Sequence, residues 1–177
     1  CVSRSFAYPI NSIEELCQAI SKYVITACVK LRKYNQYSSA ITVFITTNIH
    51  SKNFFKSEAS VNLEAPSSDS VVILKESLKL TKKIFKPYNK LQKAGVVLHK
   101  LQNNKYKQKI LFNEKDIKEE LSLEKLNYLI DNINRTNGKD TLGWGSSIIK
   151  EDWTPRRNKL SRFKTTAMEG IPIIKAN

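Results

Sequence analysis

The amino-acid sequence predicts an α+β domain of the ferredoxin-like β-α-β-β-α-β type, with two helices on one face of a four-stranded antiparallel sheet. Two observations predict this fold class. In two stretches, apolar residues recur at three- and four-residue spacing behind a residue that can cap a helix. Four other stretches are short, contain β-branched or aromatic residues and are bounded by turn residues, as strands are. The second face of such a sheet stays open and can serve as a binding platform.

The first strand is expected over residues 2–7, because this stretch is short and ends just before Pro9. Asn11 or Ser12 can then cap a helix. The spacing of its apolar residues is typical of an amphipathic helix that covers a sheet. That stripe consists of Ile13, Leu16, Cys17, Ile20, Val24, Ala27, Cys28 and Leu31.

A β-hairpin is expected next. Residues 39–48 are rich in Ile, Val, Thr and Phe, and a polar turn follows at residues 51–53. A second alternating run then continues to Leu63, ahead of Pro66. The two runs therefore predict two neighbouring antiparallel strands.

A second helix is expected to begin after Asp69 or Ser70 and to end before Pro87. Its predicted inward stripe consists of Val71, Leu74, Leu78, Thr81 and Phe85. The last strand is predicted from about residue 91 to residue 101, which completes the β-α-β-β-α-β order.

Residues 1–101 form the sheet domain in this scheme, residues 102–113 a linker, and residues 114–177 a smaller, mainly helical C-terminal region. A helix is expected over residues 116–137, with a possible break near Ser122. An Asn-Gly pair ends it. Its predicted apolar stripe consists of Leu126, Leu129, Ile130 and Ile133.

The formal net charge is +14, and it is unevenly distributed. Residues 1–112 hold 18 Lys and Arg against 6 Asp and Glu, whereas residues 113–177 hold 12 against 10. A basic field concentrated on one domain favours a polyanion as partner, with nucleic acid first and an anionic membrane surface second. The alternative is a surface that is basic only for solubility.

The apolar runs are too short to cross a membrane, so we expect a soluble chain. The chain has no initiating Met and no leader sequence, which suggests a piece of a longer polypeptide. Cys1, Cys17 and Cys28 show no paired spacing and have only the distant His50 and His99 as possible co-ligands. They predict no metal site, and they fit free thiols packed in the core of a protein in the reducing cytoplasm.

No catalytic residues are predicted in this chain. The carboxylates are scattered or concentrated on the helix of residues 114–124, where they favour the helix N-terminus. The sequence contains no Gly-rich phosphate loop and no nucleophile motif. We therefore expect neither a catalytic centre nor a cofactor in this chain.

Five segments carry a family resemblance. They are Ser3-Arg4-Ser5-Phe6, residues 40–48 (AITVFITTN), Lys93-Ala94-Gly95-Val96, residues 108–112 (QKILF) and residues 131–140 (DNINRTNGKD). In this order, they resemble the C-terminal part of UmuC-type Y-family translesion DNA polymerases. The first three resemble strands of the family's little-finger domain, the fourth its sliding-clamp motif and the fifth the region that follows.

The resemblance implies that the sheet lies along duplex DNA and holds its phosphates without reading sequence. Strand alternation then selects the residues on the open face. The expected DNA-binding residues are Ser3, Ser5, Thr42, Thr46 and Gly95, with Lys56, Lys90 and Lys93 as cations. Gly95 is expected to let a backbone approach closely. The alternative is that these are ordinary strand residues on a solvated face.

The resemblance also assigns sliding-clamp binding to Gln108, Ile110, Leu111 and Phe112. The Gln can enter a polar pocket, and the three apolar side chains can fill a groove. The alternative is that Leu111 and Phe112 pack on the chain's own core.

Further partners implied by the resemblance are damaged template-primer DNA, the processed UmuD dimer and the RecA recombinase filament. Mg²⁺ ions are expected in the catalytic domain of the parent polymerase, which this chain lacks. The implied setting is error-prone lesion bypass in the bacterial SOS response, at the nucleoid in the cytoplasm. Trp144, Trp153 and Met168 are candidate partner contacts in the C-terminal region or, alternatively, core residues.

Two other functions remain open from the residues alone. One is a stand-alone ferredoxin-like adaptor whose open sheet binds protein. The other is an RNA-binding module, although RNA-binding sheets stack bases on aromatic residues of two central strands and only Phe44 is suitably placed.

Overall fold

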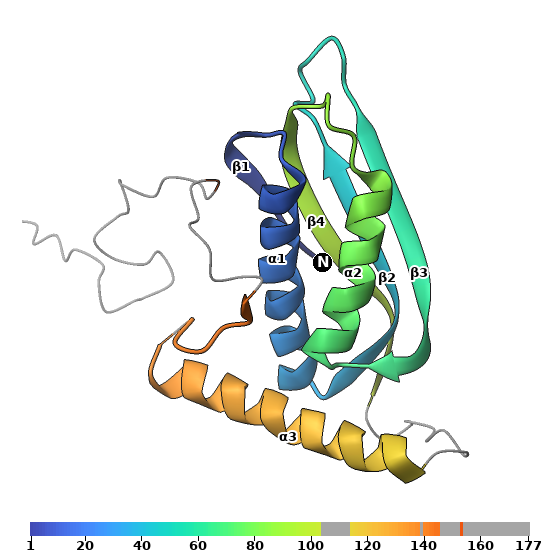
Figure 1. Ribbon diagram of the computed structural model, residues 1–177, viewed down its shortest axis with the longest axis vertical. Helices are drawn as coiled ribbons and strands as arrows, with labels where there is room; N and C mark the ends of the chain where they lie inside the picture. Colours follow the sequence, from blue (N-terminus) through green and yellow to red (C-terminus); the bar gives the residue numbers. More distant parts are fainter. Residues whose placement is uncertain (104–113, 139, 146–152, 154–177) are drawn as a thin grey trace, which may run out of the picture.

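The computed structural model of the chain describes residues 1–103, 114–138, 140–145 and 153. Its elements, in order, are β1 (Val2–Ile10), α1 (Ile13–Lys33), β2 (Gln36–Thr46), β3 (Lys56–Ser67), α2 (Ser70–Ile84), β4 (Leu91–Asn103) and α3 (Glu114–Thr136) (Figure 1). The first six elements follow the predicted order. The α+β class with a β-α-β-β-α-β arrangement is therefore confirmed.

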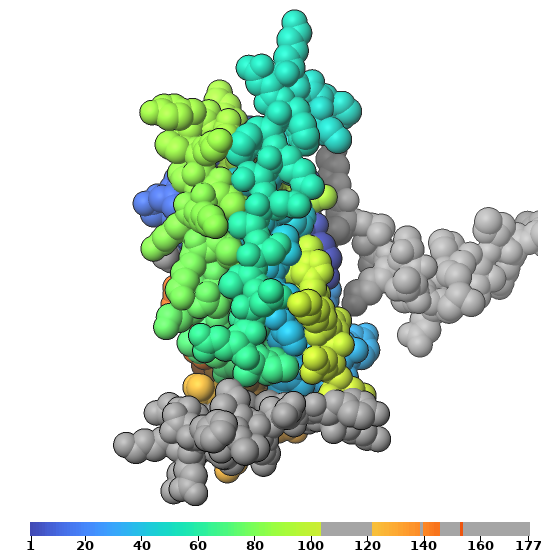
Figure 2. Space-filling view, turned by 90° about the vertical axis from the view of Figure 1, so that its right-hand side faces the viewer, coloured from blue at the N-terminus to red at the C-terminus, as the bar shows by residue number. Residues whose placement is uncertain are grey.

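The four strands form one antiparallel sheet in the order β1-β4-β2-β3. β4 lies between β1 and β2, and β2 lies between β4 and β3, so both β-α-β units are split by a strand of the other. The helices α1 and α2 lie side by side over one face (Figure 1). Figure 2 looks onto the β3 edge, with α2 on one side and the end of β4 on the other.

α1 begins as predicted. The side-chain oxygen of Ser12 accepts hydrogen bonds from the backbone N–H groups of Glu14 and Glu15, which would otherwise have no partner in the first turn. The predicted apolar stripe faces the sheet, and Leu16, Ile20, Val24 and Cys28 are fully buried in it. Burial raises the pKa of the Cys28 thiol to about 12, so this cysteine behaves as a small apolar side chain.

The predicted inward stripe of α2 is only partly correct: Thr81 is fully buried as predicted and Leu74 and Phe85 pack against the core, but the most buried positions are shifted by one residue from several predicted ones. Asp69 caps the helix as predicted, but Val71 is 39% exposed and Leu74 is only partly buried. The helix lies beside α1 as well as on the sheet, and small polar residues occupy part of its inward side. Thr81, for example, bonds the carbonyl of Ser77 within the helix. The buried positions are Ser70, Ile73, Ser77, Leu80, Thr81 and Ile84.

β1 is irregular in its second half. Its pairing with β4 shifts register between Ser5 and Ile10, which frees backbone groups from the ladder. The side-chain amide of Gln92 donates to the carbonyl of Phe6 at 2.8 Å and so satisfies one of them. The edge strand is thereby extended to Ile10, past the predicted end at residue 7.

Trp153 packs against this irregular edge. Its carbonyl oxygen accepts a hydrogen bond from the N–H of Ala7 at 3.0 Å. Its side chain is 5% exposed and meets the rings of Phe6 and Tyr23 edge-to-face, with centroids 6.1 and 6.0 Å away. Of the two roles considered for Trp153, core packing is the one observed.

α3 lies across the end of the sheet domain that contains the C-terminus of α1 (Figure 1). It runs through Ser122 without the break that was considered. Its Asp131 makes a two-pronged pair with Arg32, with Nε–Oδ2 and Nη2–Oδ1 distances of 2.6 and 2.8 Å. Asn127 is buried and donates to the carboxylate of Asp69 at 2.8 Å.

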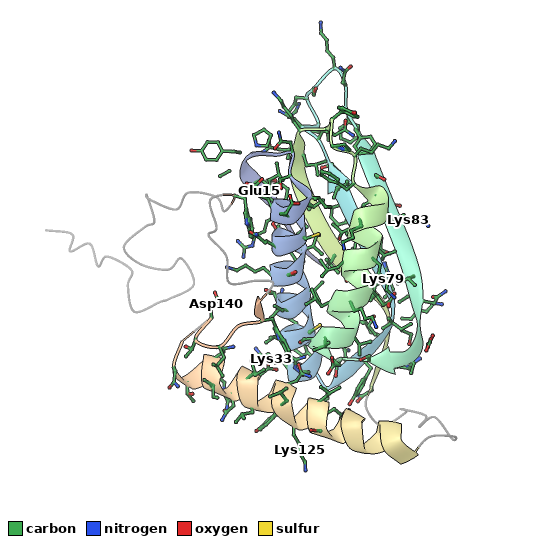
Figure 3. The ribbon with its side chains drawn as sticks, in the orientation of Figure 1. Glu15, Lys33, Lys79, Lys83, Lys125 and Asp140 are labelled. Atoms are coloured by element: carbon green, nitrogen blue, oxygen red, sulfur yellow. The ribbon has the colours of Figure 1, made fainter. Side chains whose placement is uncertain are left out.

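Half of the predicted apolar stripe of α3 faces away from the domain, whereas Ile130 and Ile133 are partly buried and Ile130 lines a groove against α1. Leu126 is 42% and Leu129 54% exposed, because the inward positions carry the polar side chains that bond Arg32 and Asp69. Figure 3 shows Lys125 pointing away from the sheet domain. In the described part of the chain, no helix is both long and apolar enough to span a membrane.

Candidate nucleic-acid interface

Four predicted DNA-binding residues form one row across the open face of the sheet. Ser5 on β1 pairs with Lys93 on β4, Lys93 pairs with Thr46 on β2, and Thr46 pairs with Lys56 on β3. Residues paired across strands project on the same face, so hydroxyl and ammonium groups alternate along this row. We call these four residues the first row.

The second row consists of Ser3, Gly95, Phe44 and Glu58. Gly95 is buried, and a Cβ placed on it would lie 2.5 Å from both Phe44 Cζ and Ser3 Cβ. The space above this glycine is therefore filled by the sheet's own side chains. This corrects the expectation that Gly95 leaves room for a ligand's backbone, because the glycine is needed to seat the Phe44 ring.

Thr42 belongs to a hydrogen-bonded chain further along the same face. Its Oγ1 lies 2.7 Å from Ser60 Oγ and 2.9 Å from His99 Nε2. Ser60 is its register partner on β3, and His99 lies two positions beyond its partner Val97 on β4. Sequence reasoning missed Ser60 and His99, because the hairpin register that brings them to Thr42 cannot be read from either strand alone.

Further lysines lie in the two loops at the first row's end of the sheet domain. The row lies at the end of the sheet from which the β2–β3 loop projects, at the top of Figure 1. Lys90, the third predicted cation, is exposed and immediately precedes β4. Lys86 lies 5.3 Å over the ring of Phe55, which packs against the core on the helix-covered side, and Lys52 is exposed in the β2–β3 loop. The predicted set omitted these two lysines, since both lie in loops.

One acidic group interrupts this basic surface. The carboxylate of Glu58 lies 3.0 Å from the ammonium of Lys56, and both side chains are about half exposed. Alternation along β3 puts them on the same face, with one residue between them. Lys56 is therefore already paired in the protein without ligand.

The open face can donate hydrogen bonds to phosphate oxygens through its hydroxyl and ammonium groups. Such contacts fix position on a duplex and carry no sequence information. They also release counterions, so binding through them weakens as salt increases. The charge and geometry of the first row suit a grip on a polyanion without base recognition.

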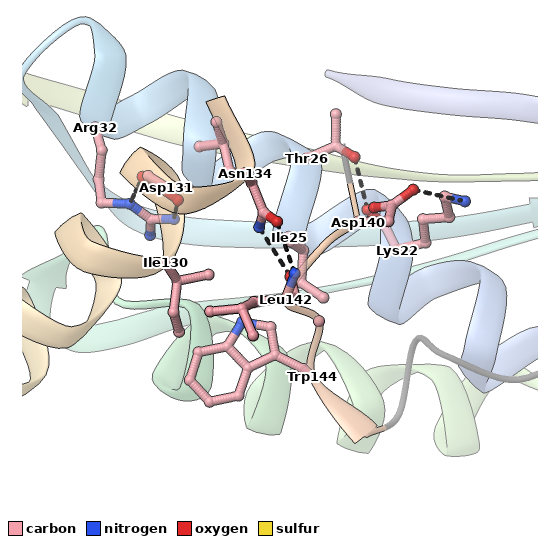
Figure 4. A pocket seen from close by; sticks show the side chains of 12 residues that line it. Lys22, Ile25, Thr26, Arg32, Ile130, Asp131, Asn134, Asp140, Leu142 and Trp144 are labelled. Atoms are coloured by element: carbon pink, nitrogen blue, oxygen red, sulfur yellow. Dashed lines mark hydrogen bonds and ion pairs between the residues drawn. The ribbon is translucent and has the colours of Figure 1, made fainter. Parts of the chain in front are cut away.

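The side of α1 that faces away from the sheet forms a groove with α3 and residues 140–145. It has a volume of about 240 Å³ and is lined by apolar side chains between two ion pairs (Figure 4). Arg32–Asp131 forms one pair, and Lys22–Asp140 forms a weaker one at 3.8 Å. The apolar lining consists of Ile25, Val29, Ile130, Leu142 and Trp144.

Several predicted residues cannot be placed in this geometry. The residues predicted to bind the clamp, Gln108, Ile110, Leu111 and Phe112, lie outside the described residues, and so does Met168. Within the described ranges, no three His, Cys, Asp or Glu side chains come together as a metal site would require.

Two sequence-family models match the chain. The impB/mucB/samB family C-terminal domain matches residues 1–111, and a domain of unknown function (DUF4113) matches residues 124–174. The first match covers the whole sheet domain. The second begins within α3 and includes Trp153.

Curated relatives match along nearly the whole chain. Protein UmuC of Salmonella typhimurium is 31% identical over 175 residues, which cover 98% of this chain and 41% of the relative. Protein MucB of Escherichia coli is 31% identical over 97% of this chain and 40% of its own length. Protein ImpB of Salmonella typhimurium is 28% identical over the same shares. The chain thus spans about two fifths of the length of these relatives.

Proposed function

Because this chain belongs to the impB/mucB/samB family, we propose that it is the DNA-binding and sliding-clamp-docking C-terminal part of an error-prone translesion DNA polymerase of the UmuC type. The observation that carries the DNA-binding part is the first row, in which Ser5, Lys93, Thr46 and Lys56 cross all four strands on one open face. The ligand is damaged template-primer DNA.

The proposed contact is with phosphates. Lys93 is exposed at the centre of the first row and supplies a charge, while Ser5 and Thr46 beside it supply short hydroxyl donors. A grip of this kind tolerates a damaged base, because the protein holds the backbone and reads no base edge. In this proposal, nucleotide addition and its Mg²⁺ ions belong to the part of the longer relatives that this chain does not match.

Duplex binding tests this proposal directly. Fluorescence anisotropy with a labelled template-primer duplex is expected to show binding that weakens as NaCl increases. Single-stranded RNA is the competitor that separates the main alternative. An RNA-binding module would prefer the RNA, and an adaptor for protein partners would bind neither nucleic acid.

Clamp docking is proposed for residues 108–112, on the sequence pattern and the family relationship. The experiment compares binding of purified bacterial sliding clamp by the native chain and by a variant in which Gln108, Leu111 and Phe112 are changed to Ala. Loss of binding in the variant supports docking through this segment. Equal binding by both chains excludes it, while a chain in which Lys93 alone is changed should bind the clamp normally.

The processed UmuD dimer and the RecA filament are proposed as partners of the C-terminal region. The exposed apolar residues Leu126 and Leu129 on the outer side of α3 support a protein contact there. Pull-down with each partner should weaken when both are changed to Ser and remain normal for Lys125→Ala. In this proposal the protein acts during the SOS response in the bacterial cytoplasm, at the nucleoid.

A further inference from the structure

The open face contains a negative charge at a point where a phosphate grip would gain from a positive one. Glu58 lies in the second row, next to the first-row residue Lys56 on the same strand. The distance between its carboxylate oxygen and the Lys56 ammonium is 3.0 Å. Their side chains are 56% and 53% exposed, so neither is held in place by burial.

This pair changes what Lys56 can contribute to binding. While the Glu58 carboxylate neutralises its ammonium, Lys56 neutralises less of a phosphate's charge. Fewer counterions are then released when DNA binds. Exposed ion pairs are weak and screened by salt, so the pair can open when a phosphate competes for the ammonium. After it opens, the free carboxylate remains beside the DNA and repels it.

We propose that Glu58 is a built-in competitor for phosphate, which occupies Lys56 in the free protein and lowers the affinity of the open face for duplex DNA. The grip is then weaker and more rapidly released than the lysines alone would give. This inference rests on the proposed function of the open face and identifies a residue that tunes it. In this proposal, Lys56 contacts phosphate only after its pair with Glu58 opens, whereas Lys93 contacts phosphate whenever DNA is bound.

Glu58→Gln is the direct test, and Glu64→Gln is its matched control. Both glutamates lie on β3 at positions of the same parity, both are exposed, and both substitutions raise the net charge by one. Among the described residues, Glu64 has no ion pair comparable to Lys56–Glu58. Both variants therefore change the net charge equally, but only Glu58→Gln frees a lysine.

The measurement is the dissociation constant for a labelled duplex across a NaCl series. For Glu58→Gln, we expect tighter binding. We also expect the salt slope, which is the slope of the logarithm of the binding constant against the logarithm of the salt concentration, to be steeper by about 0.9, the contribution of one neutralised phosphate. The ratio of the variant's affinity to the wild type's should then fall roughly 3-fold between about 50 and about 200 mM NaCl. Glu64→Gln should leave the slope unchanged. Equal slopes in both variants would overturn the proposal in favour of a general charge effect.

A double variant ties the effect to Lys56. In a Lys56→Ala background, Glu58→Gln should no longer steepen the slope, and a full gain there would contradict the proposed pairing. Lys93→Ala is included to separate this proposal from the function on which it rests. If the wild type binds no duplex, the proposed function fails. If it binds and Lys93→Ala weakens it, but Glu58→Gln does not change it, only the role of Glu58 is rejected.

Discussion

The Phe44 ring sits against Gly95, its register partner on the neighbouring strand, at the centre of the open sheet face. A Cβ on residue 95 would lie 2.5 Å from Phe44 Cζ and 2.6 Å from Cε1, closer than real Cβ atoms approach carbon. An aromatic residue that covers a cross-strand glycine pins the register of two strands. That register is also what aligns Lys93 with Thr46 in the first row.

Gly95→Ala should therefore destabilise the domain. The added methyl group meets both the Phe44 ring and the Cβ of Ser3, so at least one strand must move, and overpacking of this kind costs about 1–3 kcal/mol. Urea unfolding followed by circular dichroism measures the change. Gly145→Ala is the control, because nothing lies within 4 Å of its added Cβ, and its stability should stay within about 0.5 kcal/mol of wild type.

Trp153→Ala should loosen the β1 edge. The substitution removes a buried indole from between Phe6 and Tyr23, a change that typically costs about 3–5 kcal/mol. Without the indole, residue 153 should no longer be held at this edge. The Ala7 amide then loses its acceptor, the carbonyl of residue 153, and its hydrogen exchange should become faster. Trp144→Ala serves as the control and should leave that amide protected. An unchanged Ala7 exchange rate in Trp153→Ala would contradict the packing described for this edge.

Asp131→Ala should weaken the attachment of α3 to the sheet domain. It leaves Arg32 without its two-pronged partner in a setting where both side chains are mostly buried, and hydrogen bonds to charged groups contribute about 1.5–3 kcal/mol. Amide exchange along α3 reports the attachment. Asp140→Ala removes an exposed carboxylate 3.8 Å from Lys22 and should change little. Equal effects of the two variants would argue against Arg32–Asp131 as the main attachment.

Stability should fall at alkaline pH. Burial raises the pKa of Cys28 from 9.0 and that of Tyr23 from 10.0, each to about 12. The unfolded chain releases these protons first, so the stabilisation is complete below pH 9 and is lost as pH rises from there toward 12. Each group contributes a slope of up to about 1.4 kcal/mol per pH unit. Urea midpoints measured from pH 8 to above pH 10 should decline, and less steeply between pH 9 and 10 in Cys28→Ala.

Local rules were sufficient for the order of the elements and for the orientation of the strands. Ser12 and Asp69 cap their helices as the sequence indicated, because an N-cap depends only on a side chain and the next three residues. Alternation around buried Val96 correctly placed Lys93 on the open face. These features depend on local sequence and can be predicted without knowing which other elements they contact.

The features that were missed depend on partners far away in the sequence. Part of the inward side of α3 is polar because Asn127 and Asp131 meet Asp69 and Arg32. An apolar-stripe rule therefore finds the inward Ile130 but also assigns the exposed Leu129 to the inward side. The burial of Gly95 depends likewise on a ring from another strand. Both cases need the tertiary arrangement before the residue can be interpreted.

The most direct test of the account compares Lys93→Ala with Lys75→Ala in duplex binding across a salt series. Both remove one exposed lysine, but Lys93 lies in the first row of the open face, whereas Lys75 lies on α2, which covers the other face. If the open face binds DNA, Lys93→Ala will bind more weakly, with a salt slope lower by about 0.9, and Lys75→Ala will bind like the wild type. Equal loss in both variants, or loss in Lys75→Ala alone, would contradict the assignment of the open face as the DNA-binding surface.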